Sequence, residues 1–214
     1  MSILVANGLT HWFGKEVALE SIDLAVDAGE HMAVLGENGA GKTTLLRILA
    51  TAARPTSGRL QIMGLDAIGE RRRLRRRIGF VAHAPGLYPA LSATENLEFF
   101  CTLHNVKRER VAVTLALVGL TQVGDRPAGQ LSRGMQQRLA IGRAILHDPK
   151  LLVLDEPDSS LGSDAAELLA AVMHERTVVL ATHDHALASK LCQRTLVLRH
   201  GRSVGTATRL HVVK

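Results

Sequence analysis

Two stretches of this sequence carry residue types suited to phosphate chemistry. The first, 36-GENGAGKTT-44, fits the pattern G-x-x-x-x-G-K-[ST] between an apolar run and a helix-like run, the context in which that pattern binds nucleotides. Its glycines let backbone amides face phosphate oxygens, Lys42 is expected to reach the β- and γ-phosphates, and the Thr43 hydroxyl is expected to hold Mg²⁺. We call residues 36–44 the phosphate loop. Its predicted nucleotide-binding residues are Gly36, Glu37, Asn38, Gly39, Ala40, Gly41, Lys42, Thr43 and Thr44.

The second stretch, 151-LLVLDEP-157, ends an apolar run with two acids. A buried strand would deliver Asp155 and Glu156 at its carboxyl end, where ligands bind in open α/β sheets. Asp155 suits Mg²⁺, directly or through water, and Glu156 suits a base or polarising group for an attacking water. Two solvated acids after a strand are the alternative, but the phosphate loop upstream favours nucleotide hydrolysis.

Two further segments narrow the class of nucleotide enzyme. In 131-LSRGMQQR-138, Ser132 can cap the helix that it starts and, with Gly134, can offer donors to phosphate. In 180-LATHD-184, a strand ends at His183. A histidine after an apolar strand is usually structural. Here the strand is the next one after the acid pair, so we expect His183 to emerge beside the same pocket, close to the γ-phosphate.

The elements that must position these residues follow from the apolar pattern. We expect a strand at 31–36, a helix at 42–53, a turn at 54–58, a helix at 132–147, and then alternating strands and helices to the end of the chain. Ser92 and Glu95 form a capping box before another helix. Continuous apolar strands are typical of parallel sheets buried on both faces. The sequence thus predicts an α/β core, an N-terminal antiparallel β portion and a helical insertion at about 85–147.

In their order along the chain, these motifs resemble the ATP-binding subunit of an ABC transporter, over essentially the whole sequence. The motifs are the phosphate loop, LSRGM at 131–135, LLVLDEP at 151–157 and His183. The resemblance implies an α/β fold with a P-loop NTPase core of the ABC type, an N-terminal antiparallel β portion and a helical subdomain insertion. It implies a single ABC ATP-binding domain over 1–214, with the core at about 1–84 and 148–214 and the helical subdomain at about 85–147.

The resemblance also implies ATP and Mg²⁺ as cofactors, with Thr43 and Asp155 as the Mg²⁺ ligands and Glu156 and His183 as catalytic residues. Two such domains form a head-to-tail dimer in this family, so Ser132 and Gly134 would act in trans on the partner's ATP. An aromatic residue in 10-THWFGK-15 would stack on adenine. Phe13 is our choice and Trp12 the neighbouring alternative; both rings packing within the β portion is the third possibility.

His83 stands where the family has a glutamine, on the loop that joins the core to the helical lobe, senses Mg²⁺ and the attacking water, and lies near the membrane partner. A neutral imidazole can donate or accept one hydrogen bond but has no carbonyl oxygen, so it lacks the oxygen that a glutamine offers to Mg²⁺. The segment 83-HAPG-86, together with 131-LSRGMQQR-138 and the short length, is most similar to the ATPase subunit of the cytochrome c biogenesis haem exporter.

The sequence departs from the family at the dimer interface. The family usually has an L-D pair after the acid strand; in 157-PDSSLGSD-164, Gly162 stands at the Asp position. Either communication across the dimer is altered or Asp164 substitutes. Arg133 and Met135 replace Gly and Gln in the LSGGQ form, and Arg133 either adds positive charge near phosphate or faces solvent.

Composition excludes several classes of protein. The chain has 214 residues, of which 46% are hydrophobic, and no run approaches the roughly 18 apolar residues of a membrane span. The N-terminus lacks signal-peptide features. We therefore expect a peripheral protein at the cytoplasmic face of the inner or plasma membrane, and reduced thiols at the two cysteines. Net charge is +6, and six arginines lie within 71-RRRLRRR-77. We interpret this run as a solvated helix or loop, and the alternative is a patch that binds nucleic acid or an anionic membrane.

The leading functional prediction is an energy-coupling ATPase docked on integral membrane transporter subunits as a homodimer. Its expected cargo, from the resemblance, is haem or a haem-loaded chaperone in cytochrome c biogenesis. One alternative is the ATPase of another ABC exporter, for drug, lipid or polysaccharide. Another alternative is a soluble ABC-type ATPase that acts on nucleic acid or ribosomes. We disfavour it because the sequence lacks the long coiled-coil insertions of the DNA-repair members and the second cassette of the ribosome-acting members. Nucleic acid is therefore not an expected partner. A P-loop kinase is the third, but it would not need LSRGM and His183 together.

Overall fold

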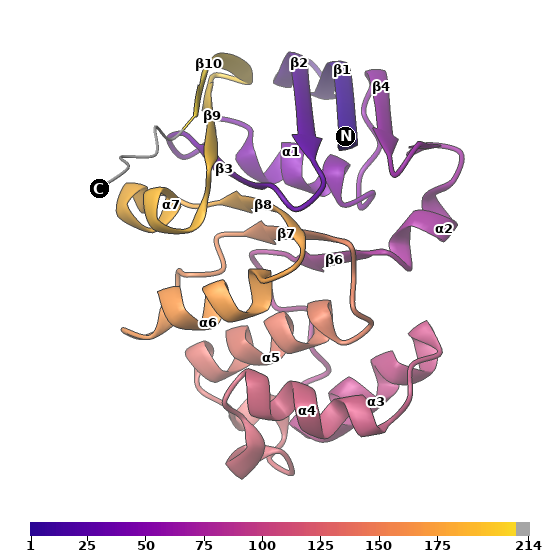
Figure 1. Ribbon diagram of the computed structural model, residues 1–214, viewed down its shortest axis with the longest axis vertical. Helices are drawn as coiled ribbons and strands as arrows, with labels where there is room; N and C mark the ends of the chain where they lie inside the picture. The colour runs from indigo at the N-terminus through magenta and orange to yellow at the C-terminus, as the bar shows by residue number, and fades with distance from the viewer. Residues whose placement is uncertain (209–214) are drawn as a thin grey trace.

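The computed structural model describes residues 1–208 and contains two β-sheets and seven α-helices in that range (Figure 1). The strands are β1 (Ser2–Phe13), β2 (Glu16–Asp27), β3 (His31–Leu35), β4 (Ser57–Ile62), β5 (Leu65–Asp66), β6 (Ile78–Val81), β7 (Leu151–Asp155), β8 (Thr177–Ala181), β9 (Arg194–Arg199) and β10 (Arg202–Thr208). The helices are α1 (Lys42–Leu49), α2 (Arg71–Arg75), α3 (Ala93–His104), α4 (Glu109–Leu117), α5 (Arg133–Ile145), α6 (Ala165–Met173) and α7 (His185–Leu191), with short 3₁₀ turns at Thr121–Val123 and Ala128–Gln130.

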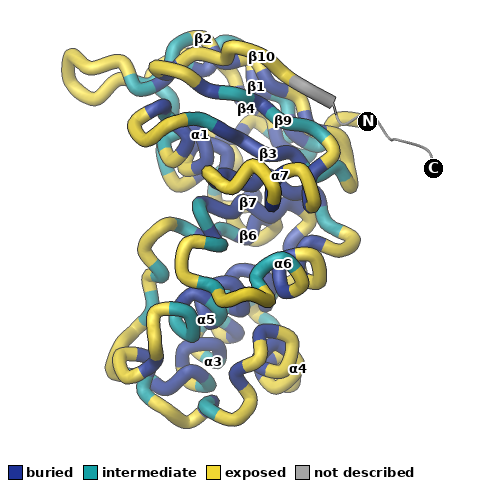
Figure 2. The backbone as a smooth tube through the Cα atoms, turned by 90° about the vertical axis from the view of Figure 1, so that its left-hand side faces the viewer, coloured by how far each residue is buried: buried dark blue, intermediate teal, exposed yellow. Residues whose placement is uncertain are grey.

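The larger sheet has six strands in the order β10-β9-β3-β8-β7-β6. Strands β9, β3, β8, β7 and β6 run parallel, and β10 pairs antiparallel with β9 at the edge. Every residue of β7 and β8 is buried, and β7 lies in the dark blue interior of Figure 2. Because parallel strands end at one edge of a sheet, the loops after β3, β7 and β8 begin side by side.

The smaller sheet, β2-β1-β4-β5, is antiparallel throughout and confirms the predicted N-terminal β portion. Helix α1 lies between the two sheets (Figure 1). Its side chains Leu45, Leu46 and Leu49 are fully buried in one cluster with Leu9 of β1 and Met32 of β3. Burial of each such side chain contributes roughly 1.5–3 kcal/mol, so α1 and the loop before it are firmly held.

Helices α3, α4 and α5 occupy the other end of the molecule and share a continuous apolar core with the large sheet. Both predicted caps are confirmed. Ser92 Oγ accepts from the Glu95 amide at 3.1 Å while Glu95 accepts from the Ser92 amide at 2.7 Å. Ser132 Oγ accepts from the Met135 amide at 3.3 Å and starts α5.

The predicted helix at 42–53 is wrong at its end. Helix α1 stops at Leu49, and Thr51 adopts a left-handed backbone with a φ of 57°. The amides of Ala52 and Ala53 both donate to the Arg47 carbonyl, which closes the helix with a turn. Ala50 and Thr51 are buried although they lie beyond the helix, so the run of buried residues is longer than the helix itself.

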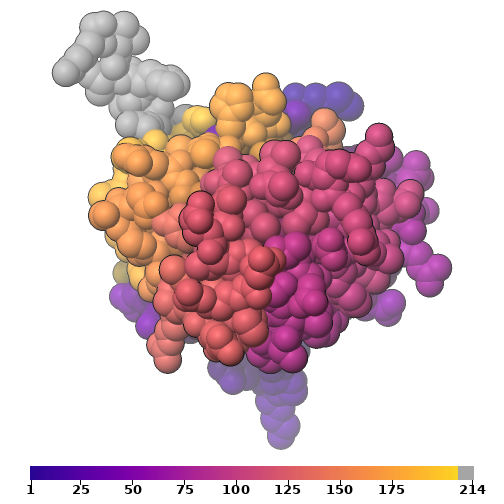
Figure 3. All heavy atoms as spheres, turned by 90° about the horizontal axis from the view of Figure 1, so that it is seen from below, coloured from indigo at the N-terminus to yellow at the C-terminus, as the bar shows by residue number. Residues whose placement is uncertain are grey.

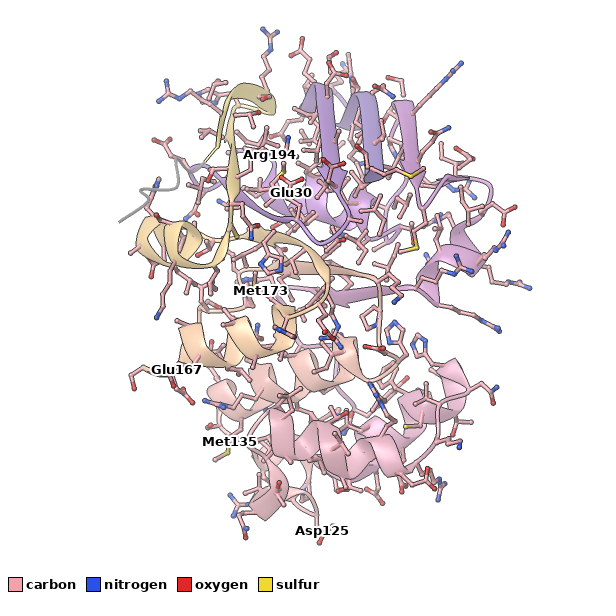
Figure 4. The ribbon with its side chains drawn as sticks, in the orientation of Figure 1. Glu30, Asp125, Met135, Glu167, Met173 and Arg194 are labelled. Carbon is pink, nitrogen blue, oxygen red and sulfur yellow. The ribbon has the colours of Figure 1, made fainter. Side chains whose placement is uncertain are left out.

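An ion pair fastens the sheet strand that carries the phosphate loop. Glu30, just before β3, receives hydrogen bonds from Arg194 at the start of β9, with 2.6 Å between Arg194 Nε and Glu30 Oε1 (Figure 4). Arg194 also donates to the Ala25 carbonyl of β2. This contact ties both sheets together at the end of β3 opposite the phosphate loop.

Within residues 1–208, no helix combines the length and apolar character needed to cross a bilayer.

Candidate nucleotide site

The phosphate loop connects β3 to α1 through glycines that no other residue could replace without rearrangement. Gly36 has a φ of 155°, and a Cβ there would lie 2.4 Å from the Leu198 carbonyl oxygen of β9. Gly41, the N-cap of α1, has a φ of 101°, and a Cβ there would lie 2.6 Å from the Ala18 carbonyl oxygen of β2. The loop is thus pressed between neighbouring strands, and its curvature depends on the absence of these side chains.

Lys42 is buried at the first turn of α1. Its ammonium group donates to the carbonyls of Gly36 at 2.7 Å and Glu37 at 3.1 Å, and lies 3.9 Å from Glu156 Oε1. The charge is therefore held inside the curl of the loop, where a phosphate group bound to the loop amides would meet it.

Asp155 is the last residue of β7 and is 1% exposed. Thr43 Oγ1 donates to its Oδ1 at 3.2 Å, and its Oδ2 is buried without a hydrogen-bond partner in the structure. Burial raises the pKa of this carboxyl, while the Thr43 hydroxyl acts in the opposite direction. A buried carboxylate oxygen without a partner, next to a hydroxyl, is a donor set that fits Mg²⁺.

The ion expected here would be shared with a nucleotide. Within residues 1–208, no group of three or more His, Cys, Asp or Glu side chains is arranged to hold a metal by itself. Mg²⁺ is commonly bound by one or two protein ligands together with substrate phosphates and water. Thr43 and Asp155 meet that requirement beside the phosphate loop.

Glu156 lies at the centre of the candidate site. Its backbone is left-handed, with a φ of 50°, and its amide donates to the Ala181 carbonyl of β8 at 2.9 Å. Its carboxylate lies 3.2 Å from His183 Nδ1 and 3.7 Å from His83 Nδ1. A left-handed residue of this type costs about 1–2 kcal/mol, and it is retained where the chain turns the carboxylate toward Lys42 and the two imidazoles.

His183 follows β8, which is hydrogen-bonded directly to β7. The preceding residue, Thr182, is fully buried; its hydroxyl donates to Asp158 Oδ2 at 2.9 Å and accepts from the Asp184 amide at 3.0 Å. These bonds fix the turn that carries His183. Neither Thr182 nor Asp158 was singled out from the sequence, because only strand pairing brings the two segments together.

Phe13 faces the phosphate loop from the antiparallel sheet. It lines a hollow of ≈ 300 Å³ whose other lining residues are Glu16, Val17, Ala18, Asn38, Gly39, Gly41, Lys42, Thr43, Thr44 and Glu156. The Phe13 side chain is 57% exposed, and its ring meets the His11 ring edge-on with centroids 4.6 Å apart. Trp12 is 49% exposed and does not line this hollow. Both rings are thus about half exposed, and the choice of Phe13 for adenine stays a prediction.

Ser132 and Gly134 lie at the start of α5, away from the phosphate loop of the same chain (Figure 1). Neither lines the hollow that contains Phe13 and Lys42. A Cβ on Gly134 would lie 2.7 Å from the Ser160 carbonyl oxygen, and Gln137 donates to the Pro157 carbonyl at 3.3 Å. The start of α5 is thus packed against the segment that follows the acid pair.

The loop carrying His83 joins these two regions. His83 is 69% exposed and lines a hollow together with Pro85, Arg133, Gln136, Gln137, Ser159 and Ser160. Farther along, the amides of Ala128 and Gly129 donate to the carbonyls of Leu91 and Pro89. The view from the helical end accordingly shows the segment before α3 beside the segment before α5 (Figure 3). His83 therefore lies beside Glu156 and lines the same hollow as Arg133.

Asp164 is held within its own chain. Arg138 Nη2 of α5 donates to Asp164 Oδ1 at 2.6 Å, while Arg138 Nη1 donates to the Val118 carbonyl at 3.2 Å. The hydrogen bond from Arg138 lowers the pKa of this carboxyl. Asp164 thereby bridges α5 and the start of α6, an engagement that competes with the interface role considered for it from the sequence.

Comparison with known proteins decides the family. Residues 19–159 match the family described as "ABC transporter". The chain belongs to the ABC transporter family. It is an ABC-type ATPase coupled to transport, and the predicted fold class, a P-loop core with a mixed α/β arrangement, is confirmed.

Individual relatives of this ABC ATPase differ in their named cargo. It is 36% identical to "Probable sulfate/thiosulfate import ATP-binding protein CysA" of Chlorella vulgaris, over 98% of this chain and 93% of that protein. It is 38% identical to "Lipoprotein-releasing system ATP-binding protein LolD 1" of Caulobacter vibrioides, over 94% of each. Other relatives are longer: the match covers 63% of "Bacitracin transport ATP-binding protein BcrA" of Bacillus licheniformis.

A solved structure of similar sequence has the same fold. The ATP-binding cassette MJ0796, in a dimeric post-hydrolysis state bound to ADP and Pi, superimposes with a TM-score of 0.88 at 28% identity, over 96% of this chain and 98% of that one. ABC ATPases bind ATP, which agrees with the phosphate loop and the acid pair in this chain.

Proposed function

We propose that this ABC ATPase hydrolyses ATP between the two subunits of a head-to-tail homodimer, with Glu156 and His183 as the catalytic residues. The observation that carries the proposal is the meeting of Lys42, His83 and His183 around the Glu156 carboxylate, beside the phosphate loop. We further propose a single ABC domain over 1–214, whose core at about 1–84 and 148–214 is joined to a helical subdomain at about 85–147.

In the proposed reaction, ATP and water give ADP and phosphate. The Glu156 carboxylate accepts a proton from the water while the water oxygen attacks the γ-phosphorus. His183 Nδ1, 3.2 Å from Glu156 Oε1, orients that carboxylate. Lys42 and the amides of the phosphate loop neutralise charge on the phosphates. Mg²⁺, when held by Thr43 and Asp155, supplies further neutralisation. Phe13 stacks on the adenine ring, and its position in the hollow of the loop supports this role.

Ser132 and Gly134 are proposed to contact the ATP of the partner subunit. Support comes from their separation from the phosphate loop in one chain and from the dimeric state named for MJ0796. A dimer assembled in this way buries nucleotide between subunits, so ATP binding favours the closed pair and hydrolysis releases it. Mixing two inactive variants tests the arrangement. A Ser132→Arg chain and a Lys42→Ala chain together should recover part of the ATPase rate, because one of the two composite sites is intact; absence of recovery would contradict action in trans.

We propose integral membrane transporter subunits as the partners, with the ATPase placed peripherally on the cytoplasmic face of the inner or plasma membrane. Membership of the ABC transporter family supports this assignment. Affinity purification from detergent-solubilised membranes should recover a stable integral membrane protein, and that protein should stimulate the ATPase. Recovery of ribosomes or nucleic acid in its place would favour the soluble alternative.

For the cargo, we propose haem, exported or released with its chaperone during cytochrome c biogenesis. The support is the resemblance of the loop 83-HAPG-86 and of 131-LSRGMQQR-138 to the haem exporter ATPase. Among the relatives reported above, the lipoprotein-releasing and bacitracin transport proteins support another ABC exporter as the second candidate. The sulfate/thiosulfate relative is named for import. Deletion of the gene should abolish covalent haem staining of c-type cytochromes while b-type haem persists. Normal c-type cytochromes would reject haem as the cargo.

A further inference from the structure

The arginine run 71–77 contains the short helix α2 (Arg71–Arg75), which has two different faces. Leu74 of α2 is fully buried. On the same side, Arg71 Nη2 and Arg75 Nη2 both donate to the Thr51 carbonyl, at 2.7 Å and 3.0 Å. These two arginines therefore attach α2 to the turn that ends α1, and their guanidinium groups have a structural use.

On the other side, two arginines of α2 and its C-cap residue, Arg76, extend into solvent. Arg72, Arg73 and Arg76 are exposed and line one shallow hollow of ≈ 380 Å³ with Gly69 and Glu70. Within residues 1–208, the side chains of these three arginines form no hydrogen bond or ion pair with a protein group. Glu70 is the single acid of that lining. The hollow thus has a strong excess of positive charge, since three guanidinium groups oppose one carboxylate.

An exposed apolar residue precedes the lining residues of this hollow in the chain. Ile68 is 40% exposed and directly precedes Gly69 in the loop between β5 and α2. Its neighbour Ala67 is buried and anchors the loop. Guanidinium groups bind phosphate oxygens in paired hydrogen bonds, and an aliphatic side chain beside them can enter the boundary between headgroups and acyl chains.

We propose that Arg72, Arg73 and Arg76, together with Ile68, form a contact surface for the anionic phospholipid headgroups of the bilayer that holds the transporter subunits. Charge complementarity and the exposed isoleucine favour lipid as the occupant. Nucleic acid is disfavoured because α2 has only five residues and carries no aromatic ring for base stacking. The proposal rests on the peripheral membrane placement proposed above. It adds a direct attachment of this ATPase to the lipid bilayer, which does not depend on the transporter subunits.

Sedimentation of the purified chain with vesicles tests this surface. Binding to vesicles of phosphatidylcholine with 30% phosphatidylglycerol (about one anionic lipid in three, enough for a negative surface potential) should exceed binding to phosphatidylcholine alone and should weaken as salt screens the charges. The triple variant Arg72→Gln, Arg73→Gln, Arg76→Gln should lose roughly a hundredfold, since each arginine near the surface contributes about 1 kcal/mol and 1.4 kcal/mol is a factor of ten. Ile68→Ser should reduce binding with its salt dependence unchanged.

A matched control removes three exposed arginines elsewhere: Arg59→Gln, Arg108→Gln and Arg126→Gln. This variant has the same net charge as the test variant, so equal loss of vesicle binding in both would overturn a specific surface on α2. Binding of duplex DNA but not of anionic vesicles would overturn the choice of lipid. ATPase activity in solution is measured in parallel. It should be unchanged in both triple variants, so failure of vesicle binding is distinguishable from failure of the proposed enzyme function.

Discussion

Glu156 Oε1 lies 3.2 Å from His183 Nδ1, a contact made between the ends of two adjacent parallel strands. The pairing places Asp155 opposite Ala181, so the next residues of both strands leave the sheet together. The left-handed backbone of Glu156 then turns its side chain toward the histidine. The acid and the histidine are thereby positioned by rigid elements before any ligand arrives.

Replacement of Glu156 by glutamine should separate ATP binding from hydrolysis. Glu156→Gln keeps the shape of the side chain but cannot accept a proton, so we expect ATP affinity to be retained and turnover to fall by about 10²–10⁴. ATP-bound dimer should then accumulate in size-exclusion chromatography. Glu167→Gln is the matched control, because Glu167 points away from the molecule on α6 (Figure 4). Unchanged turnover in Glu156→Gln would reject its catalytic role.

His83 is expected to couple the acid pair to the membrane partner. His83→Ala removes the imidazole 3.7 Å from Glu156 Oε2, so partner-stimulated ATPase should fall several-fold while ATP binding changes little. His83→Gln, which restores a side-chain amide, should recover part of the stimulation. The exposed His174 supplies the control His174→Ala. Equal losses of stimulation and of ATP binding in His83→Ala would instead indicate a purely structural residue.

The charged form of Asp155 should lower the free energy of unfolding of this protein. Because burial raises its folded-state pKa above 3.8, the charged carboxylate destabilises the native state at pH 7, and this penalty disappears as pH falls below 3.8. Asp155→Asn should therefore raise Tm by a few degrees at pH 7 while abolishing Mg²⁺-dependent ATP hydrolysis. Thermal unfolding of the variant and the unmodified chain at pH 7 and pH 3.5 measures the difference. A Tm at pH 7 that is lower in Asp155→Asn than in the unmodified chain would contradict the expected stabilisation.

Phe13 and Trp12 form a natural pair of test and control. Phe13→Ala removes the ring that faces the phosphate loop and should weaken ATP binding roughly tenfold, since stacking of an aromatic ring on a base is worth about 1–3 kcal/mol. Phe13→Tyr should bind normally. Trp12→Ala should have little effect, because Trp12 does not line that hollow. Titration with a fluorescent ATP analogue measures all three, and the reverse order of effects would assign adenine to Trp12.

His147 should make the fold sensitive to mild acid. Its ring stacks on His104 with centroids 4.0 Å apart, its Nε2 lies 3.2 Å from the Ile78 carbonyl, and its Nδ1 is buried without a partner. Burial and then His104 lower its pKa from 6.5 to about 4, with Arg176 acting in the same direction, while the Ile78 carbonyl and Asp148 act against them. Between these values the unfolded chain binds more protons, so stability falls as pH drops from 6.5 toward 4.

His147→Phe tests that expectation. Phenylalanine keeps a stacked ring but binds no proton, so the decline in unfolding free energy between pH 6.5 and pH 4.5 should shrink by on the order of 2 kcal/mol. Urea unfolding at several pH values provides the measurement. His174→Phe, at an exposed position, should leave the slope unchanged. A slope in His147→Phe equal to that of the unmodified chain would mean that other groups cause the acid sensitivity.

The sequence by itself determined the parts of this protein that depend on local chain geometry. The phosphate loop needs glycines and a lysine at fixed spacing, and Gly36 and Gly41 occupy the backbone conformations that this spacing indicates. The capping box of Ser92 is equally local, since its bonds span three residues. Apolar strands indicated a parallel sheet, because strands buried on both faces have continuous apolar residues and no alternation of polar and apolar side chains.

Only the tertiary structure decided which distant side chains meet. The contacts of Glu156 with His83 and His183 depend on the order of β6, β7 and β8 in the sheet. The binding of Asp164 by Arg138, and the division of the arginines of α2 between Thr51 and solvent, depend on how helices pack. Spacing along the chain carries little information about these contacts, because packing of the whole core, rather than the properties of neighbouring residues, sets the distances between them.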